Sequence, residues 1–170
     1  MKRIIIFLVS IFLCTFAYAA QKEVPVPKEL SVQIQNLTEL LRDSYAVGYP
    51  EATIHKTIKL SDDNEITLAV FTIEGFGGGN NHTQYLAGFT PEKDETNKIH
   101  YQLIDVIPIG GKGSRGVFEL NVNAKLDKKT RITTFVFDTM TVTKDDAPNF
   151  PSKNTKTTVI LNDNRFTEVK

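Results

Sequence analysis

The chain contains few of the residues that build the commonest chemical sites. Of its 170 residues none is tryptophan, two are methionine and one, Cys14, is cysteine. Cys14 lies in an N-terminal segment that we expect to be removed, so the remaining chain has no disulfide and no cysteine nucleophile. The fold of that remaining chain must therefore be held together by its apolar core.

Residues 1–20 have the composition of a cleaved secretory signal. Lys2 and Arg3 precede a mostly apolar run at residues 4–16, and the small-x-small sequence Ala-Tyr-Ala at residues 17–19 is typical of a cleavage site. The apolar run is shorter than a membrane-spanning helix needs. We therefore predict an exported protein, periplasmic or secreted, that has no membrane span after cleavage.

The length and charge of the remaining chain limit its class. Residues 21–170 are enough for one domain with a sizeable core and too few for two ordinary domains. The full chain has 20 basic and 20 acidic residues, and without Lys2 and Arg3 the net charge is about −2. A nucleic-acid-binding protein normally carries a basic face. We therefore predict a single globular domain over residues 21–170 that does not bind nucleic acid.

The hydrophobic pattern predicts an α+β fold. Residues 30–46 carry an apolar stripe at helical spacing, and Gly48 and Pro50 end the segment. The stripe consists of Leu30, Ile34, Leu37 and Leu41. After Pro50 the chain has the pattern of about eight strands, joined by connections too short for parallel crossovers. We predict one N-terminal amphipathic helix packed on a curved antiparallel β-meander, either sandwich-like or barrel-like.

Three strand segments carry particular expectations. Residues 66–73 are apolar on both faces, which predicts a central strand covered on both sides. Residues 99–109 form a long strand with Pro108 near its end, so that end should be an edge or a bulge. Residues 117–124 alternate, which predicts that Phe118 points inward.

Two glycine-rich loops stand out within the β region. Residues 75–81 read GFGGGNN and residues 110–116 read GGKGSRG, and together they hold eight of the ten glycines. Glycine costs entropy to fix, so such clusters need a reason. The loops follow alternate strands of a predicted meander, and we therefore expect them at the same end of the sheet. Loops held on a rigid scaffold often form binding surfaces.

The first loop allows two interpretations. Phe76 is an apolar side chain among glycines, and Asn80, Asn81, His82 and Gln84 follow it as a dense set of hydrogen-bonding groups. In a functional interpretation this is a mobile polar loop that closes on a ligand, with the phenylalanine as an anchor. In a structural one it is a bulged hairpin whose asparagines are left-handed and whose phenylalanine plugs the end of a barrel.

The second loop also allows two interpretations. Residues 111–116 match G-x-G-x-x-G, but the segment that follows alternates with period two, so the helix of a dinucleotide site is not predicted. Backbone N–H groups of such a loop can form an anion-binding concavity, with Lys112 and Arg115 adding charge beside Ser114. The alternative is a wide hairpin loop with two solvated cations.

Three carboxylates interrupt the strand alternation. Glu74, Asp105 and Asp138 each fall on an otherwise apolar face, where a charge is costly unless it is paired. Two of them converging in a cleft would suit general acid–base hydrolysis. Alternatively, each lies near a strand end or is paired with a cation. A spatial separation of about 5–10 Å would favour the hydrolase.

Metal and cofactor sites are not predicted. The three histidines, His55, His82 and His100, have neither the helical nor the strand spacing of a zinc site. The serine nucleophile motif G-x-S-x-G is absent. We expect no cofactor and no metal.

Our leading hypothesis is a non-enzymatic binding protein of the inhibitor or accessory type. Its partner is another protein or a small polar or anionic ligand, which it contacts through the two glycine loops. The predicted contact residues are Phe76, Asn80, Asn81, His82, Gln84, Lys112, Ser114 and Arg115. The alternatives are a small hydrolase that uses Asp105 with Glu74 or Asp138, and a structural envelope protein without a ligand.

Overall fold

The computed structural model describes residues 24–169. The predicted targeting segment lies outside the described residues. The elements are α1 (Lys28–Leu41), β1 (Val47–Gly48), the 3₁₀-helix η1 (Pro50–Ala52), β2 (Ile54–Ser61), β3 (Asn64–Phe76), β4 (Asn81–Lys93), β5 (Ile99–Gly111), β6 (Arg115–Gly116), β7 (Val122–Leu126), β8 (Thr133–Thr141), β9 (Lys153–Asn162) and β10 (Arg165–Val169). Over residues 24–169, no helix has both the length and the apolarity needed to cross a membrane.

The ten strands form one antiparallel sheet. Its order is β1-β3-β4-β5-β6-β8-β9-β10, with β2 also paired to β3 and β7 also paired to β8. The prediction of a mostly antiparallel sheet with one helix is confirmed. The predicted number of about eight strands was too low, since the two-residue strands β1 and β6 have no pattern in the sequence. The sheet does not close on itself, so the barrel variant is wrong.

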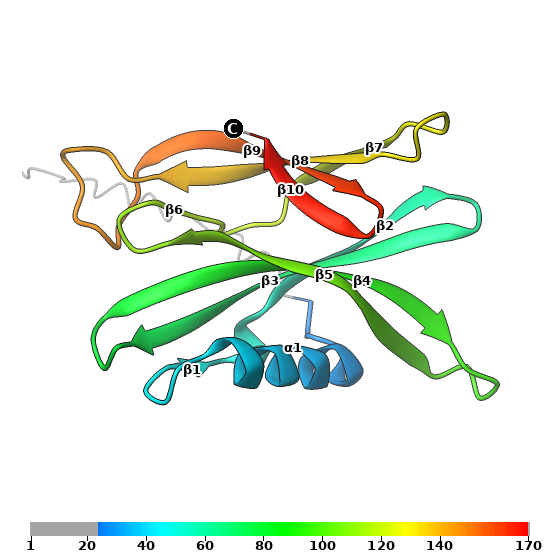
Figure 1. Cartoon of the computed structure of the whole chain (residues 1–170), viewed down its shortest axis with the longest axis horizontal. Coiled ribbons are helices and arrows are strands. Elements are labelled where there is room, and N and C mark those ends of the chain that lie inside the picture. Colours follow the sequence, from blue (N-terminus) through cyan, green and yellow to red (C-terminus); the bar gives the residue numbers. More distant parts are fainter. Residues whose placement is uncertain (1–23, 170) are drawn as a thin grey trace, which may run out of the picture.

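The helix ends at Leu41, earlier than the predicted residue 46. Arg42 already has an extended backbone with ψ of 155°, and the carboxylate of Asp43 accepts the backbone N–H groups of the next turn. The apolar stripe of α1 is buried with Phe71, Phe89 and Tyr101 of the β3–β5 region. Figure 1 shows α1 lying along the outer side of these strands.

A second core lies on the opposite face of β3–β5. The sheet bends so that these strands face β8–β10, as Figure 1 shows. Leu68 and Leu86 are fully buried in this inter-sheet core together with Phe135, Phe137 and Val159. Because β3 contributes to both cores, the prediction of a doubly covered strand at residues 66–73 is confirmed.

Two bulges interrupt the pairing of β5 with β4. The pairing with β4 shifts beside Pro108, which confirms the predicted irregularity there, although β5 is an interior strand. The expectation that Phe118 points inward is wrong, because its side chain is 58% exposed. The nearby residues Val117 and Leu120 are buried instead, at a spacing of three rather than two, because residues 117–121, between β6 and β7, form no strand.

The connections gather at two ends of the inter-sheet core. The glycine-loop end consists of residues 75–81, 110–116 and 143–152, at the left in Figure 1. The turn end consists of the β2–β3, β7–β8 and β9–β10 turns, toward the right in Figure 1. These two ends provide the surfaces on which a function can be built.

Candidate functional site

The two glycine loops lie side by side. In the β4–β5 ladder Thr83 pairs with Gly111, so the end of the first loop is adjacent to the start of the second. The backbone N–H of Lys112 donates to the carbonyl oxygen of His82 at 3.2 Å, and the Lys112 ammonium donates to the side-chain oxygen of Asn80. The prediction that the loops are neighbours is confirmed.

A shallow cavity of about 330 Å³ lies where the loops meet. His82, Lys112, Ser114 and Arg115 all contribute to its lining. Four of the eight predicted contact residues thus line one cavity, and Asn80 is joined to them by its hydrogen bond with Lys112. The cavity floor is formed by the end of β5, which includes Pro108.

The conformation of the first loop depends on its glycines. Gly75, Gly77 and Gly78 have φ of 90°, 66° and 73°, in the left-handed region that other residues avoid. Neither Asn80 nor Asn81 has a positive φ, so the expectation of left-handed asparagines is wrong. The pairing of β3 with β4 shifts within this hairpin, as a bulge requires.

Asp43 ties the first loop to the segment after the helix. One of its carboxylate oxygens accepts the N–H of Gly77 at 2.8 Å. The other accepts the N–H groups of Tyr45 and Ala46 at 2.9 and 2.8 Å. These hydrogen bonds, the one from Gly77 first, lower the pKa of Asp43 below its ordinary value. The loop is therefore anchored at its tip.

Phe76 and Gln84 hold the loops in place. Phe76 is partly buried against the core between α1 and the sheet, so it does not plug the end of a barrel. The side-chain oxygen of Gln84 accepts the N–H of Val117 at 2.7 Å, and its amide nitrogen donates to the carbonyl of the same residue at 3.1 Å. This two-point contact joins β4 to the chain beyond the second loop.

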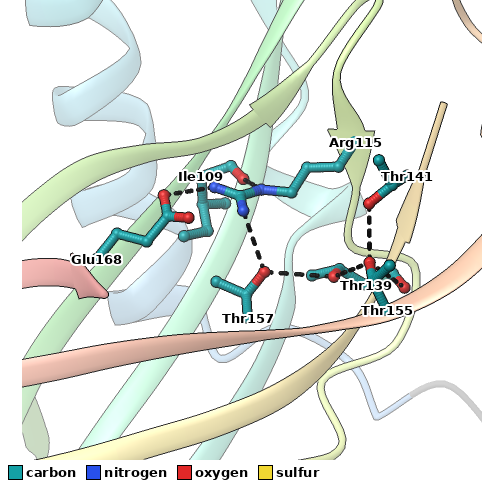
Figure 2. Close-up of polar contacts among 7 residues, drawn as sticks. All are labelled: Ile109, Arg115, Thr139, Thr141, Thr155, Thr157 and Glu168. Atoms are coloured by element: carbon teal, nitrogen blue, oxygen red, sulfur yellow. Dashed lines mark hydrogen bonds and ion pairs between the residues drawn. The ribbon is translucent and has the colours of Figure 1, made fainter. Parts of the chain in front are cut away.

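Arg115 bridges the two halves of the sheet, as Figure 2 shows. Its Nε donates to the carbonyl oxygen of Ile109 on β5 at 2.5 Å. Its terminal nitrogens reach Glu168 on β10 at 2.5 Å and the hydroxyl of Thr157 on β9 at 3.3 Å. The side chains of Arg115 and Glu168 are 22% and 24% exposed. Arg115 is thus a paired structural cation and not a solvated one.

Threonine hydroxyls continue this network between β8 and β9. Thr139 lies within hydrogen-bonding distance of both Thr157 and Thr155, and Thr141 also bonds Thr155 (Figure 2). Thr139 and Thr157 are buried. The glycine-loop end of the inter-sheet core is therefore filled by hydrogen-bonded polar groups.

A third loop, residues 143–152, completes this surface. The N–H of Gly113 donates to the carbonyl oxygen of Pro148 at 2.8 Å. Asp146 closes the third loop on itself by accepting the N–H of Thr143 and the hydroxyl of Ser152, and the pKa of Asp146 is lowered, most strongly by the former. Two prolines, Pro148 and Pro151, predict a long loop over residues 143–153, but its contact with Gly113 could not be predicted, because it is made by backbone groups.

Two exposed aromatic side chains flank the paired loops. Tyr45 is 69% exposed, and Phe150 of the third loop is 74% exposed. The Tyr45 ring lies beside Gly78, where a Cβ atom would be 3.6 Å from the ring. We define the loop-end surface as Tyr45, Asn80, His82, Lys112, Ser114 and Phe150. Tyr45 and Phe150 were not predicted, since exposure of a single aromatic is not visible in a sequence.

The three candidate acids do not share a cleft. Asp105 accepts the N–H of Val106 at 2.9 Å and that of Phe166 at 2.7 Å, so both carboxylate oxygens are used by the backbone. Asp105 pairs with Gly88, which pairs with Leu68. Glu74 lies six residues further along β3, roughly 20 Å away.

Asp138 belongs to another surface. It forms a salt bridge with Lys156 at 2.8 Å and lines a separate cavity of about 400 Å³ together with Phe118. The expectation that Asp138 lies on an apolar inward face is wrong, because its neighbours Phe137 and Thr139 are the buried residues of β8. The paired carboxylates of a glycosidase are therefore not formed by the predicted residues.

Within residues 24–169 no three His, Cys, Asp or Glu side chains are placed to hold a metal ion. Comparison of the chain with protein-family models, curated proteins and solved structures finds no match. The function must therefore be inferred from the chain's own geometry.

Proposed function

We propose that this chain is an exported, non-enzymatic binding protein of the inhibitor or accessory type that contacts another protein through the loop-end surface. One observation carries the proposal. Three loops that are distant in sequence are fastened to one another, and a shallow polar cavity lies where the first two meet. Two exposed aromatic side chains accompany it, Tyr45 beside Gly78 of the first loop and Phe150 in the third loop.

The fastening of the loops favours binding. Asp43 holds the first loop, the carbonyl of Pro148 accepts the N–H of Gly113 in the second, and Asp146 closes the third. A surface that is ordered before it meets its partner loses less conformational entropy on association. The glycine loops thus serve as a preorganised platform rather than as a mobile lid.

The side chains on this platform suit a protein partner. Tyrosine and other aromatic residues contribute much of the binding energy at protein interfaces, and Tyr45 and Phe150 are available for this role. Lys112, His82 and Ser114 add polar groups to the rim. A cavity of about 330 Å³ is at the lower end for small-molecule sites, and it suits one inserted side chain of a partner.

Export is supported by the sequence of residues 1–20, with its basic start, apolar run and Ala-Tyr-Ala site. The remaining chain lacks cysteine and would tolerate an oxidising compartment without mispaired thiols. Localisation is checked by N-terminal sequencing of the protein recovered from its own host, where export predicts a start at residue 20 or 21.

The test is affinity capture from envelope and culture extracts of the host. The loop-end variant combines Tyr45→Ser, Lys112→Ala and Phe150→Ser, and it leaves Arg115 and Gln84 intact because they hold the fold. The matched control combines Val32→Ser, Leu40→Ser and Lys93→Ala, which changes two exposed apolar side chains and one lysine elsewhere.

We expect a protein that is retained by the wild type and by the control, and at least tenfold less by the loop-end variant. Retention of the same protein by the loop-end variant would place the binding surface elsewhere. If the wild type retains no protein from either extract, the proposed function is wrong, and the interpretation as a structural envelope protein without a ligand is favoured.

A further inference from the structure

A cavity of about 660 Å³ opens between the two halves of the sheet at the turn end. The apolar part of its lining belongs to the edge of the inter-sheet core and includes Leu60, Ile66, Ile104 and Leu161. The volume lies within the range of small-molecule sites. Here the core is not closed by polar side chains as it is at the glycine-loop end.

Two cations from one turn stand at the mouth of this cavity. Lys128 and Arg131 belong to the β7–β8 turn and line the opening. Neither takes part in a salt bridge among the residues that the structure describes. Both side chains therefore keep their charge available to a ligand.

Fewer acidic than basic side chains face the mouth of the cavity. Asp163 lines the opening from the β9–β10 turn. Glu65 also contributes, but its neighbour Ile66 points into the inter-sheet core, so strand alternation directs the Glu65 carboxylate to the other face of β3. Two cations thus face one carboxylate, and the mouth favours an anionic group.

The backbone of Arg131 gives an independent indication. Its φ is 60°, and its N–H closes the turn on the carbonyl oxygen of Asp127 at 2.8 Å. Glycine is the usual residue at such a left-handed position of a hairpin. The other non-glycine residues with positive φ are asparagine or aspartate, which tolerate it. A guanidinium kept at a strained position beside a cavity points to a role for that guanidinium.

We propose that the cavity at the turn end binds a single-chain amphiphile with an anionic headgroup. The alkyl chain lies on the apolar part of the lining, and the headgroup contacts Lys128 and Arg131 at the mouth. A guanidinium can bond a carboxylate or a phosphate with two parallel N–H groups. This site is separate from the loop-end surface and does not depend on the proposed function.

Isothermal titration of the purified protein tests the proposal, with each probe below its micelle concentration. Dodecanoate and dodecyl phosphate distinguish the two headgroups, and dodecyltrimethylammonium is the cationic counterpart. The variants are Arg131→Gly, Lys128→Gln and Asp163→Asn. Lys129→Ala is the matched control, because it removes a cation from the same turn that does not line the cavity.

We expect one or both anionic probes to bind with Kd of about 10–100 μM, and the cationic probe to bind at least tenfold more weakly. Arg131→Gly and Lys128→Gln should each weaken anion binding by about tenfold, Lys129→Ala should change it less than twofold, and Asp163→Asn should tighten it by about two- to threefold. Binding of only one anion supports the proposal and identifies the headgroup.

The Arg131→Gly variant separates binding from folding. Glycine is at ease at φ of 60°, so Tm should be unchanged or higher by about 2–4 °C while binding is lost. Absence of binding to both anions, equal binding of the cationic probe, or full affinity in both Arg131→Gly and Lys128→Gln would overturn the proposal.

Discussion

The two ends of the inter-sheet core use left-handed backbone positions in opposite ways. At the glycine-loop end these positions are glycines, and the Arg115 network fills the space between the half-sheets. At the turn end they are Arg131 and the Asp-Asn pair of the β9–β10 turn, and the core remains open as a cavity.

The difference lies in how closely the backbones approach one another. A Cβ atom at Gly110 would lie 2.6 Å from the carbonyl oxygen of Arg115, and one at Gly111 would lie 2.7 Å from that of His82. Glycine is needed there because backbone packs against backbone, within the second loop at Gly110 and between that loop and β4 at Gly111. The turns at the other end do not meet in this way, so their side chains have room and a cavity is left between them.

The largest loss of stability should come from adding a side chain where the two backbones approach closely. Gly111→Ala combines a φ of 154° with a backbone clash, and it should lower the free energy of unfolding by about 3 kcal/mol. Gly113→Ala, with φ of 74° and no heavy atom within 4 Å of the added Cβ, should cost about 1 kcal/mol. Urea unfolding measures both. Equal costs would show that close packing does not explain the glycines.

The next largest loss of stability is expected at Arg115 of the glycine-loop end, and Arg131 of the turn end is its counterpart. Arg115→Gln removes the bonds to Glu168 and to the carbonyl of Ile109 in a mostly buried setting, and should cost about 2 kcal/mol. Arg131→Gln loses no described bond of its side chain and should change stability by less than about 0.5 kcal/mol. A double-mutant cycle of Arg115→Gln with Glu168→Gln should show a coupling of about 1 kcal/mol. Equal losses of stability in Arg115→Gln and Arg131→Gln would contradict this difference between the two ends.

A smaller effect concerns pH. The folded-state pKa of Asp43 is lowered by the N–H groups of Gly77, Tyr45 and Ala46, so its contribution to stability is present above the ordinary value of 3.8 and is lost as pH falls below it. Asp127 at the turn end has a pKa lowered by N–H groups of its own turn.

The matched variants are Asp43→Asn and Asp127→Asn, followed by urea midpoints between pH 2 and 7. Each should flatten the loss of stability below pH 4. Amide exchange at Gly77 should speed up only in Asp43→Asn, because Asp43 joins two distant segments while Asp127 holds its own turn. Unchanged exchange at Gly77 would show that Asp43 does not anchor the loop.

The smallest effect on stability is expected at an exposed lysine of each end. Lys112→Ala removes a hydrogen bond to Asn80, and Lys128→Ala removes a free ammonium, so each should change stability by less than about 0.5 kcal/mol. Partner capture should fall in Lys112→Ala alone. A fall in Lys128→Ala would move the proposed surface to the turn end.

The sequence predicted elements whose signal is local. The helix stripe, the doubly covered strand at residues 66–73 and the irregularity at Pro108 follow from periodicity and from the missing N–H of proline. The adjacency of the two glycine loops followed from meander topology.

Contacts between distant residues could not be predicted. Arg115 is 53 residues from Glu168, and Gln84 is 33 residues from Val117. In the sequence the side chains of Arg115 and Gln84 therefore had no visible partner. Asp138 was assigned to the wrong face, because alternation alone does not say which face of a strand is buried. The cavity at the turn end is built from three separate turns and left no pattern in the sequence.

Hydrogen–deuterium exchange of the protein with and without its captured partner tests the central claim most directly. The claim predicts added protection at residues 43–49, 75–81, 110–116 and 143–152, with none at the β7–β8 and β9–β10 turns. Protection confined to those turns, with the glycine loops unchanged, would contradict it.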